Sequence, residues 1–259
     1  MEPNYDDNKQ ILNLIVEKGE LPRYIYKYTS IESAILIINS SKLKFSKPSE
    51  FNDPFDCNLT IDTNNTSEEI DNHIELLRKK NNLTDEKLKI VKSKFHNSEE
   101  LFKITNISIK QVKETFGITC FSKNEKNLIM WAHYCNKHTG LCMKFDILAD
   151  PDFFMLPFLV LYKDEYPKFN YIRNRDGLAK FLVETKSEDW KYEQEIRVMK
   201  QEDGFYGFKK EALVEIVFGI RTPIDDRERI ADALKNKSYE NVDFKSSKIS
   251  DSKFEIEIV

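Results

Sequence analysis

The densest group of side chains that could do chemistry lies in residues 116–146, FGITCFSKNEKNLIMWAHYCNKHTGLCMKFD. His133, Cys135, His138 and Cys142 are residue types that bind zinc, but their spacing is HxCxxHxxxC rather than two close ligand pairs. On a helix, positions 133 and 135 point to different sides, and position 142 falls in the following apolar run. The spacing therefore predicts no metal site in this segment.

A cysteine nucleophile is the second chemistry that this segment offers. Cys120 lies inside an apolar run of strand length, and Cys135 has no basic neighbour that the spacing fixes. Both fit buried, unreactive thiols better than an activated nucleophile. The functional contribution of the segment narrows to Ser122, His133 and Tyr134, which we expect to form one wall of a cleft, with His133 as a candidate catalytic residue.

A second group of ionisable side chains lies in the stretch WKYEQEIRV, where Glu193, Glu195 and Arg197 occupy alternate positions. If this stretch is one strand, the two carboxylates and the guanidinium project from the same face. An arginine beside a carboxylate positions it and keeps it ionised, which suits a group that orients a ribose hydroxyl or stabilises positive charge. The alternative is an ion-paired edge that faces solvent.

The first strand supplies further candidates. In RYIYKYTS, Tyr24, Tyr26 and Tyr28 alternate and should share one face, with Lys27 on the other face. A turn after the second strand, FNDPFD, holds Asn52 and Asp53, whose side chains either fix the backbone of the turn or line the cleft. Lys27, Tyr28, Asn52 and Asp53 are therefore candidate ligand-binding residues.

Elements that would position these residues follow from hydrophobic periodicity and from capping signals. We expect helices over 1–20, 30–39, 127–138, 176–185 and 225–235, and strands over 24–28, 43–46, 117–121, 141–145, 158–162, 186–199, 212–219, 242–244 and 254–258. Residues 62–115 nearly lack Gly and Pro and predict a helical insert, with a capping box at Thr66–Glu69. The fold expected is one α+β domain over 1–259, with a central mixed or split antiparallel sheet and the insert at 62–115.

Composition limits the function classes. The chain is 40% hydrophobic and 32% charged, with a net charge of −4, so no overall basic field points to nucleic acid. Its four cysteines form no CxxC pair, its first residues lack an apolar signal core, and no apolar run approaches the ~18 residues that a membrane span needs. We therefore expect a cytoplasmic protein without a membrane partner.

Four segments together resemble the bacterial domain-of-unknown-function family 2971, DUF2971. They are YIYKYTSIESAILIINSSKLKFSKPSEFNDPFD, ITCFSKNEKNLIMWAHYCNKHTGLCMKFD, VLYKDEYP and TKSEDWKYEQEIRV, which span about residues 24–220 outside the insert. The opening strand, helix and strand, followed by NDP, are also similar, more weakly, to the start of the ADP-ribosyltransferase fold.

The weaker resemblance implies an NAD site with residues in three places. Lys27 or Tyr28 would take the first place, where His or Arg is usual in that fold. Ser122 or Tyr134 would take the second. Glu195, with Glu193 as its competitor, would take the third, and Arg197 would hold the carboxylate.

The function that this resemblance implies is an NAD-dependent ADP-ribosyltransferase or an NAD glycohydrolase, acting as a toxin or phage-defence effector. NAD would be the substrate, no metal is expected, and the acceptor would be nucleic acid, protein or water. One alternative is a metal-dependent nuclease that uses Asp53, Glu193 and Glu195 around Mg²⁺. The other is a non-catalytic nucleotide-binding or sensing module that stacks its ligand on Tyr26, Tyr28 and Trp131. The sequence leaves the oligomeric state open.

Overall fold

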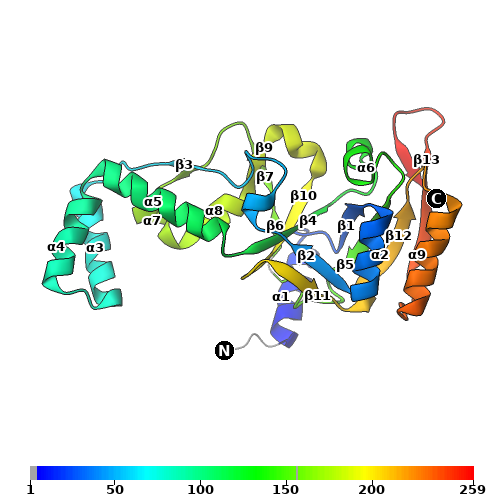
Figure 1. The fold of residues 1–259 in the computed structure, drawn as a ribbon, viewed down its shortest axis with the longest axis horizontal. Helices are drawn as coiled ribbons and strands as arrows, with labels where there is room; N and C mark the ends of the chain where they lie inside the picture. The colour runs from blue at the N-terminus through cyan, green and yellow to red at the C-terminus, as the bar shows by residue number, and fades with distance from the viewer. Residues whose placement is uncertain (1–4, 156) are drawn as a thin grey trace. The chain divides into compact units, whose positions relative to one another are not determined.

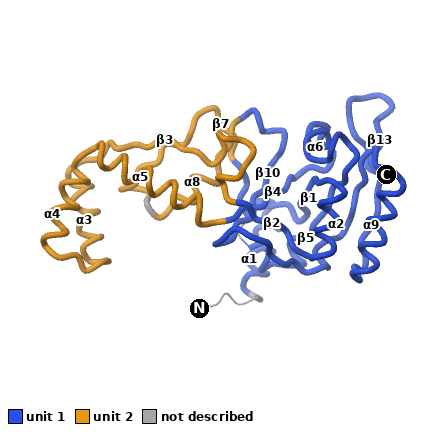
Figure 2. The backbone as a smooth tube through the Cα atoms, viewed as in Figure 1, with its two compact units in different colours: residues 1–46, 117–160, 188–259 blue, residues 47–116, 161–187 orange. Residues whose placement is uncertain are grey.

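The computed structural model describes residues 5–155 and 157–259 and divides the chain into two compact units. Unit 1 comprises residues 1–46, 117–160 and 188–259, and unit 2 comprises residues 47–116 and 161–187 (Figure 2). The predicted insert, 62–115, therefore lies within a larger unit that also recruits a later part of the chain. The single domain over residues 1–259 stays a prediction.

Unit 1 is built around an eight-stranded sheet in the order β14-β13-β12-β5-β1-β4-β10-β6 (Figure 1). One pair of neighbours, β12 and β13, is parallel and the other pairs are antiparallel, so the sheet is mixed, as predicted. Its strands are β1 (Tyr24–Thr29), β4 (Gly117–Ser122), β5 (Leu141–Asp146), β6 (Phe158–Leu159), β10 (Glu195–Lys200), β12 (Leu213–Phe218), β13 (Asp243–Ile249) and β14 (Ile256–Ile258). A separate antiparallel ribbon pairs β2 (Lys42–Phe45) with β11 (Gly204–Gly207).

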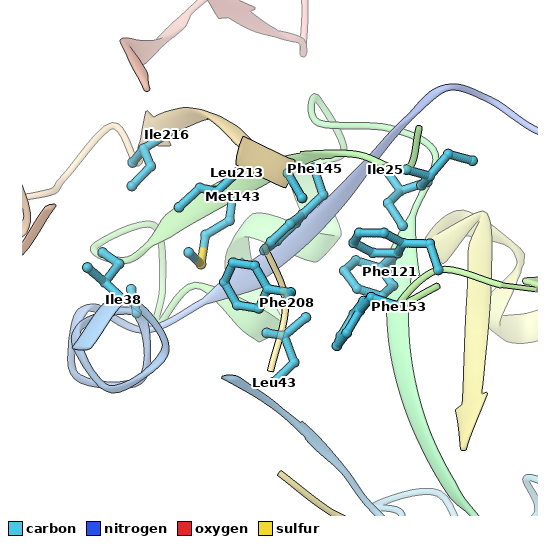
Figure 3. Close-up of a cluster of buried hydrophobic side chains, with 14 of the residues drawn as sticks. Ile25, Ile38, Leu43, Phe121, Met143, Phe145, Phe153, Phe208, Leu213 and Ile216 are labelled. Carbon is cyan, nitrogen blue, oxygen red and sulfur yellow. The ribbon is translucent and has the colours of Figure 1, made fainter. Parts of the chain in front are cut away.

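One face of this sheet carries the main hydrophobic core, which Figure 3 shows in close-up. Met143 and Phe145 of β5, Phe121 of β4 and Ile216 of β12 project into this core. Met143 and Phe145 do so together because residues two apart along a strand share a face. Three helices contribute apolar residues to the same core: α1 (Tyr5–Glu17), α2 (Ile31–Ser40) and α9 (Ile224–Asn236). The first of these confirms the predicted N-terminal helix within the described residues, and residues 1–4 of that prediction lie outside them.

The opposite face of the sheet carries a smaller cluster, which we call the α6 face. Tyr28, Cys142 and Val217 from the sheet pack there against Trp131 of α6 (Leu128–Tyr134). The 3₁₀ segment η3 (Glu188–Glu193) adds Tyr192 to this cluster. A second 3₁₀ segment of unit 1, η4 (Lys210–Ala212), precedes β12.

Unit 2 is mainly helical, as predicted for its insert. Its helices are α3 (Ser67–Asn81), α4 (Asp85–Phe95), α5 (Ser98–Lys113), α7 (Tyr171–Asn174) and α8 (Leu178–Glu184), with 3₁₀ segments η1 (Pro48–Glu50) and η2 (Arg175–Gly177). Two short parallel pairs complete it, β3 (Thr60–Ile61) with β8 (Lys168–Phe169) and β7 (Leu161–Lys163) with β9 (Thr185–Ser187). The capping box predicted at Thr66 is present, because the Thr66 side chain accepts from the backbone N–H of Glu69 and the Glu69 carboxylate accepts from that of Thr66.

Three predicted elements differ from the structure. The strand expected over 158–162 is two strands in different units, β6 and β7. The helix expected over 127–138 ends at Tyr134, because residues 136–138 have left-handed backbone, with φ of 45°, 59° and 71°. The strand expected over 186–199 is interrupted by η3, and Gln194 joins η3 to β10 with a φ of 46°. A left-handed residue cannot continue the alternation of a strand, so this interruption separates Glu193 from the face pattern of Glu195.

Candidate functional site

Three of the central strands place candidate residues in one row on the α6 face. Tyr26 of β1 is the register partner of Ser122 in β4, and Ser122 is the register partner of Glu195 in β10. Register partners in a sheet project from the same face, so Arg197, two residues beyond Glu195, lies on that face as well. The structure thus brings Ser122, Glu195 and Arg197 together on one face of the sheet.

Glu195 and Arg197 form a buried ion pair with two contacts. Arg197 Nε donates to Glu195 Oε1 at 2.7 Å, and a terminal nitrogen of the same guanidinium donates to Oε2 at 3.2 Å. Arg197 is 0% exposed and Glu195 is 4% exposed, so the alternative of a solvent-facing edge is wrong. A bidentate pair of this kind holds both side chains in a fixed orientation inside the protein.

Glu193 lies in η3, before the start of β10. The prediction that it shares a strand face with Glu195 is wrong, because the left-handed backbone of Gln194 interrupts the strand between them. The Glu193 carboxylate oxygen Oε1 accepts a hydrogen bond from the Tyr134 hydroxyl at 2.5 Å. Its backbone carbonyl accepts from Ser122 Oγ at 2.6 Å. Ser122 is fully buried and also accepts from the backbone N–H of Asn124, so its hydroxyl fixes the end of η3 against β4.

The exposed edge of this group is aromatic. His133 is exposed, and its Nδ1 lies 3.4 Å from the hydroxyl of half-buried Tyr192. The ring of Tyr192 lies 6.2 Å from that of His133 and 5.9 Å from that of Trp190. Asn127, at the start of α6, links that helix to η3, because its side-chain amide donates to the carbonyl of Tyr192 at 2.7 Å.

His133, Tyr134, Tyr192 and Glu193 therefore form one connected group, which we call the Tyr–Glu cluster. It combines a buried carboxylate, a phenol that donates to it and an exposed imidazole beside a second phenol. A carboxylate in this setting can accept from sugar hydroxyls or face a developing positive charge, and an exposed imidazole can exchange a proton with solvent.

Tyr28 does not offer its hydroxyl to a ligand. That hydroxyl donates to the carbonyl of Asn124 at 2.6 Å and accepts from the backbone N–H of Asn127 at 3.4 Å. Its ring packs edge-on against Trp131 at 5.3 Å, and both side chains are buried. Burial raises the pKa of Tyr28 above its ordinary value of 10.0. Tyr28 and Trp131 are therefore core residues that anchor the loop before α6, and they do not form the predicted stacking surface.

Lys27 projects from the other face of the sheet, as the alternation predicts, and therefore away from Glu195. Its ammonium donates to Thr119 Oγ1 at 3.2 Å and to the carbonyl of Cys120 at 3.1 Å, and it lies 5.4 Å from the centre of the Phe121 ring. Burial lowers the pKa of Lys27 below 10.5. The sheet itself separates Lys27 from the Tyr–Glu cluster.

Asn52 and Asp53 belong to unit 2, so their role in a site with the Tyr–Glu cluster stays a prediction. Within unit 2, Asp53 has the structural role that the turn suggests. Its side-chain oxygen Oδ1 accepts from the backbone N–H of Phe55 at 2.9 Å, which closes the turn around Pro54. Asn52 is exposed.

Cys135 and Cys142 are buried, and burial raises the pKa of both thiols, in line with unreactive core residues. Cys120 differs from the prediction, because it is partly exposed. Among residues 5–155 and 157–259, no three His, Cys, Asp or Glu side chains come together so that they could hold a metal ion. No helix in the described ranges is long and apolar enough to cross a membrane.

Sequence reasoning missed three residues that shape the site. Asn127 caps α6 by accepting from the N–H groups of residues 129 and 130, and its position before an apolar helical run was a readable signal. Tyr192 lies in the stretch WKYEQEIRV, whose alternating charges directed the prediction to Glu193, Glu195 and Arg197 instead. Gln194 carries no sequence signal for its left-handed backbone, because glycine or asparagine is the usual residue there.

Residues 130–198 match the family model described as "Protein of unknown function (DUF2971)". This match confirms the resemblance to DUF2971, and it includes all four residues of the Tyr–Glu cluster as well as Glu195 and Arg197. No curated protein and no solved structure matches the chain. The family description names no activity.

Proposed function

We propose that the Tyr–Glu cluster binds NAD and breaks the bond between nicotinamide and ribose, with transfer of ADP-ribose to water or to a macromolecular acceptor. The observation that carries this proposal is the 2.5 Å contact from Tyr134 to Glu193 beside the exposed His133 and Tyr192 pair. The weaker likeness to ADP-ribosyltransferases in the opening strands supports the same activity and fold. A role as a toxin or phage-defence effector rests on that likeness alone.

The chemistry needs a carboxylate more than it needs an acid. When the glycosidic bond of NAD breaks, its electron pair goes to the pyridinium nitrogen, and neutral nicotinamide leaves without being protonated. Positive charge then develops on the ribose ring, where a fixed carboxylate stabilises it. Glu193 would supply this carboxylate, and the hydrogen bond from Tyr134 would hold its orientation. Water or an acceptor hydroxyl then attacks the ribose carbon and releases one proton, which His133 would accept.

The neighbouring residues act as positioning residues in this proposal. Ser122 fixes the carbonyl of Glu193, and Asn127 fixes that of Tyr192, so both ends of the cluster are tied to the sheet and to α6. Glu195 and Arg197 form a buried ion pair at the start of β10, directly after the cluster. Aromatic rings at the exposed edge, His133 and Tyr192, offer faces on which a nicotinamide or adenine ring can stack.

Release of nicotinamide from NAD, followed by chromatography, tests the proposal with three matched variants. Glu193→Gln keeps an acceptor for Tyr134 but removes the charge, and should lower turnover by about 100-fold or more. Glu195→Gln should also lower turnover, through the position of β10. Glu188→Gln is the control on the same 3₁₀ segment, because Glu188 pairs with Lys191 in an exposed ion pair, and should retain wild-type turnover.

Full turnover in Glu193→Gln would reject Glu193 as the reacting carboxylate. Full turnover in both Glu193→Gln and Glu195→Gln would reject this site. No nicotinamide from the wild-type protein, together with no thermal shift on adding NAD, would reject the proposal as a whole.

A non-catalytic nucleotide-binding module is the second candidate, and the burial of the carboxylates favours it. Glu193 and Glu195 are each 4% exposed, while the aromatic side chains at the edge of the cluster are half-buried or exposed. Such an arrangement can stack a base without bringing a carboxylate to the ribose. A thermal shift with NAD or another nucleotide, without nicotinamide release, would favour this candidate. The nuclease alternative has no observation in its favour among the described residues.

A further inference from the structure

Unit 2 contains a cavity of about 720 Å³ that the proposed function does not use. Its walls come from α3 on one side and from α7, η2 and α8 on the other. The three helices are labelled in Figure 1. The volume falls within the range of ordinary small-molecule sites. The lining residues that carry the argument are Leu76, Lys79, Lys80, Ile172, Arg173 and Phe181.

The two walls are held together before any ligand binds. Arg173 of α7 donates to both carboxylate oxygens of Glu69 in α3, at 2.8 and 3.0 Å, and to the carbonyl of Asn64 at 3.0 Å. The hydrogen bond from Arg173 lowers the pKa of Glu69 to about 2. Asn170 caps the start of α7 by accepting from the backbone N–H groups of residues 172 and 173. A cavity with fixed walls binds a ligand at a lower entropic cost.

Two cations line this cavity with their charge uncompensated. Lys79 and Lys80 are exposed, and within the described part of the chain neither forms an ion pair with a carboxylate. Asp176 adds one negative charge to the lining, and Arg173 shares its charge with Glu69. Lysines at the end of α3 also complement the helix dipole, but that role does not require them to border a cavity. The lining therefore favours an anion.

An apolar surface lies in the same cavity as these cations. Leu76, one helical turn before Lys79 and Lys80, is 67% exposed and lines the cavity. Ile172 and Phe181 from the opposite wall are half-buried. His73 also lines the cavity, and its ring stacks on that of Phe95, with the ring centres 5.5 Å apart. An anion with an apolar or aromatic body would cover this surface and reach both lysines.

We infer that the cavity between α3 and the α7–α8 segment binds a small organic phosphate with an aromatic body, such as a nucleoside phosphate. The phosphate lies at Lys79 and Lys80, and the aromatic body lies against Leu76 and Phe181. This site belongs to unit 2 and is independent of the Tyr–Glu cluster, so it is a second ligand site rather than part of the proposed NAD reaction.

Fluorescence titration with trinitrophenyl-ATP, a nucleotide whose emission rises in apolar surroundings, tests the inference on the full chain. The double variant Lys79→Glu/Lys80→Glu should weaken binding at least tenfold, because it reverses both charges at the phosphate. The matched control is Lys87→Glu/Lys89→Glu on α4, which makes the same charge change at exposed lysines outside the cavity, and should bind within twofold of wild type. Leu76→Gln should weaken binding about threefold without changing the charge.

Three results would overturn the inference. Equal weakening in the two charge-reversal variants would mean long-range attraction rather than a site. Unchanged binding in Lys79→Glu/Lys80→Glu would place the probe elsewhere. A single-stranded RNA oligomer that displaces the probe at a far lower concentration than AMP does would assign the surface to nucleic acid. The NAD proposal is read separately through nicotinamide release, which none of these variants should change.

Discussion

On the α6 face of the unit 1 sheet, the charges of Arg197 and Glu195 neutralise each other inside the protein, at 2.7 Å. On the core face of the same sheet, the ammonium of Lys27 meets a hydroxyl, a backbone carbonyl and an aromatic ring. Both solutions satisfy a buried cation, but they respond differently to a mutation. Removing one member of an ion pair leaves a buried charge behind, whereas removing Lys27 leaves only neutral groups.

Among variants of these two buried cations and their neighbours, Arg197→Met should lower the stability of the protein most. The variant leaves the Glu195 carboxylate buried without the charge of Arg197 beside it. It should lower the free energy of unfolding by about 3–5 kcal/mol, measured by urea denaturation. The double variant Glu195→Gln/Arg197→Met also removes the charge of the carboxylate and should recover a large part of the lost stability. A loss below about 1 kcal/mol in the single variant would show that the ion pair does not hold β10 in place.

Tyr28→Phe should show a smaller effect on the same face. The variant removes the hydrogen bond to the Asn124 carbonyl, and should lower the free energy of unfolding by about 1 kcal/mol. Tyr24→Phe is the control on the same strand, because Tyr24 lies 36% exposed at its start. Equal stability of the two variants would contradict the role of Tyr28 as the anchor of the loop before α6.

Lys27→Met should show the smallest effect at neutral pH, within about 1 kcal/mol of wild type, because the loss of two hydrogen bonds is offset by the relief of burying a charge. The pKa of Lys27 is lowered on folding, so between the folded value and 10.5 the unfolded chain binds the proton and the native protein does not. The stability of wild type relative to Lys27→Met should therefore rise as the pH rises toward 10.5. A flat difference between the two proteins over that interval would mean that the ammonium is not desolvated.

The sequence predicted much of this sheet because its strands alternate clearly. Tyr24, Tyr26 and Tyr28 against Lys27 placed the two faces correctly, and the capping box at Thr66 placed the start of α3. The resemblance to DUF2971 was predicted as well, and residues 130–198 confirm it.

The site was predicted only in part, because its arrangement depends on backbone conformation and on contacts between distant segments. Nothing in the local pattern shows that Gln194 adopts a φ of 46°, and this one residue moves Glu193 from the strand face to Tyr134. Nor does any pattern show that the Tyr28 hydroxyl is occupied by a loop nearly a hundred positions later. Interactions of this kind are set by the packing of the whole unit, which overrides local propensity.

The division of each unit into separate stretches of chain bears on how the protein is made. The chain passes from one unit to the other after residues 46, 116, 160 and 187. During synthesis, β1 is the first strand of the sheet to leave the ribosome, but Tyr28 and its partner Asn124 are 96 positions apart. β4 also pairs with β10 on the edge that faces away from β1, and β10 follows the last stretch of unit 2. One edge of β4 therefore stays unpaired in the nascent chain until β10 has been made, about three quarters of the way along the chain, which raises the contact order and exposes the intermediate to aggregation.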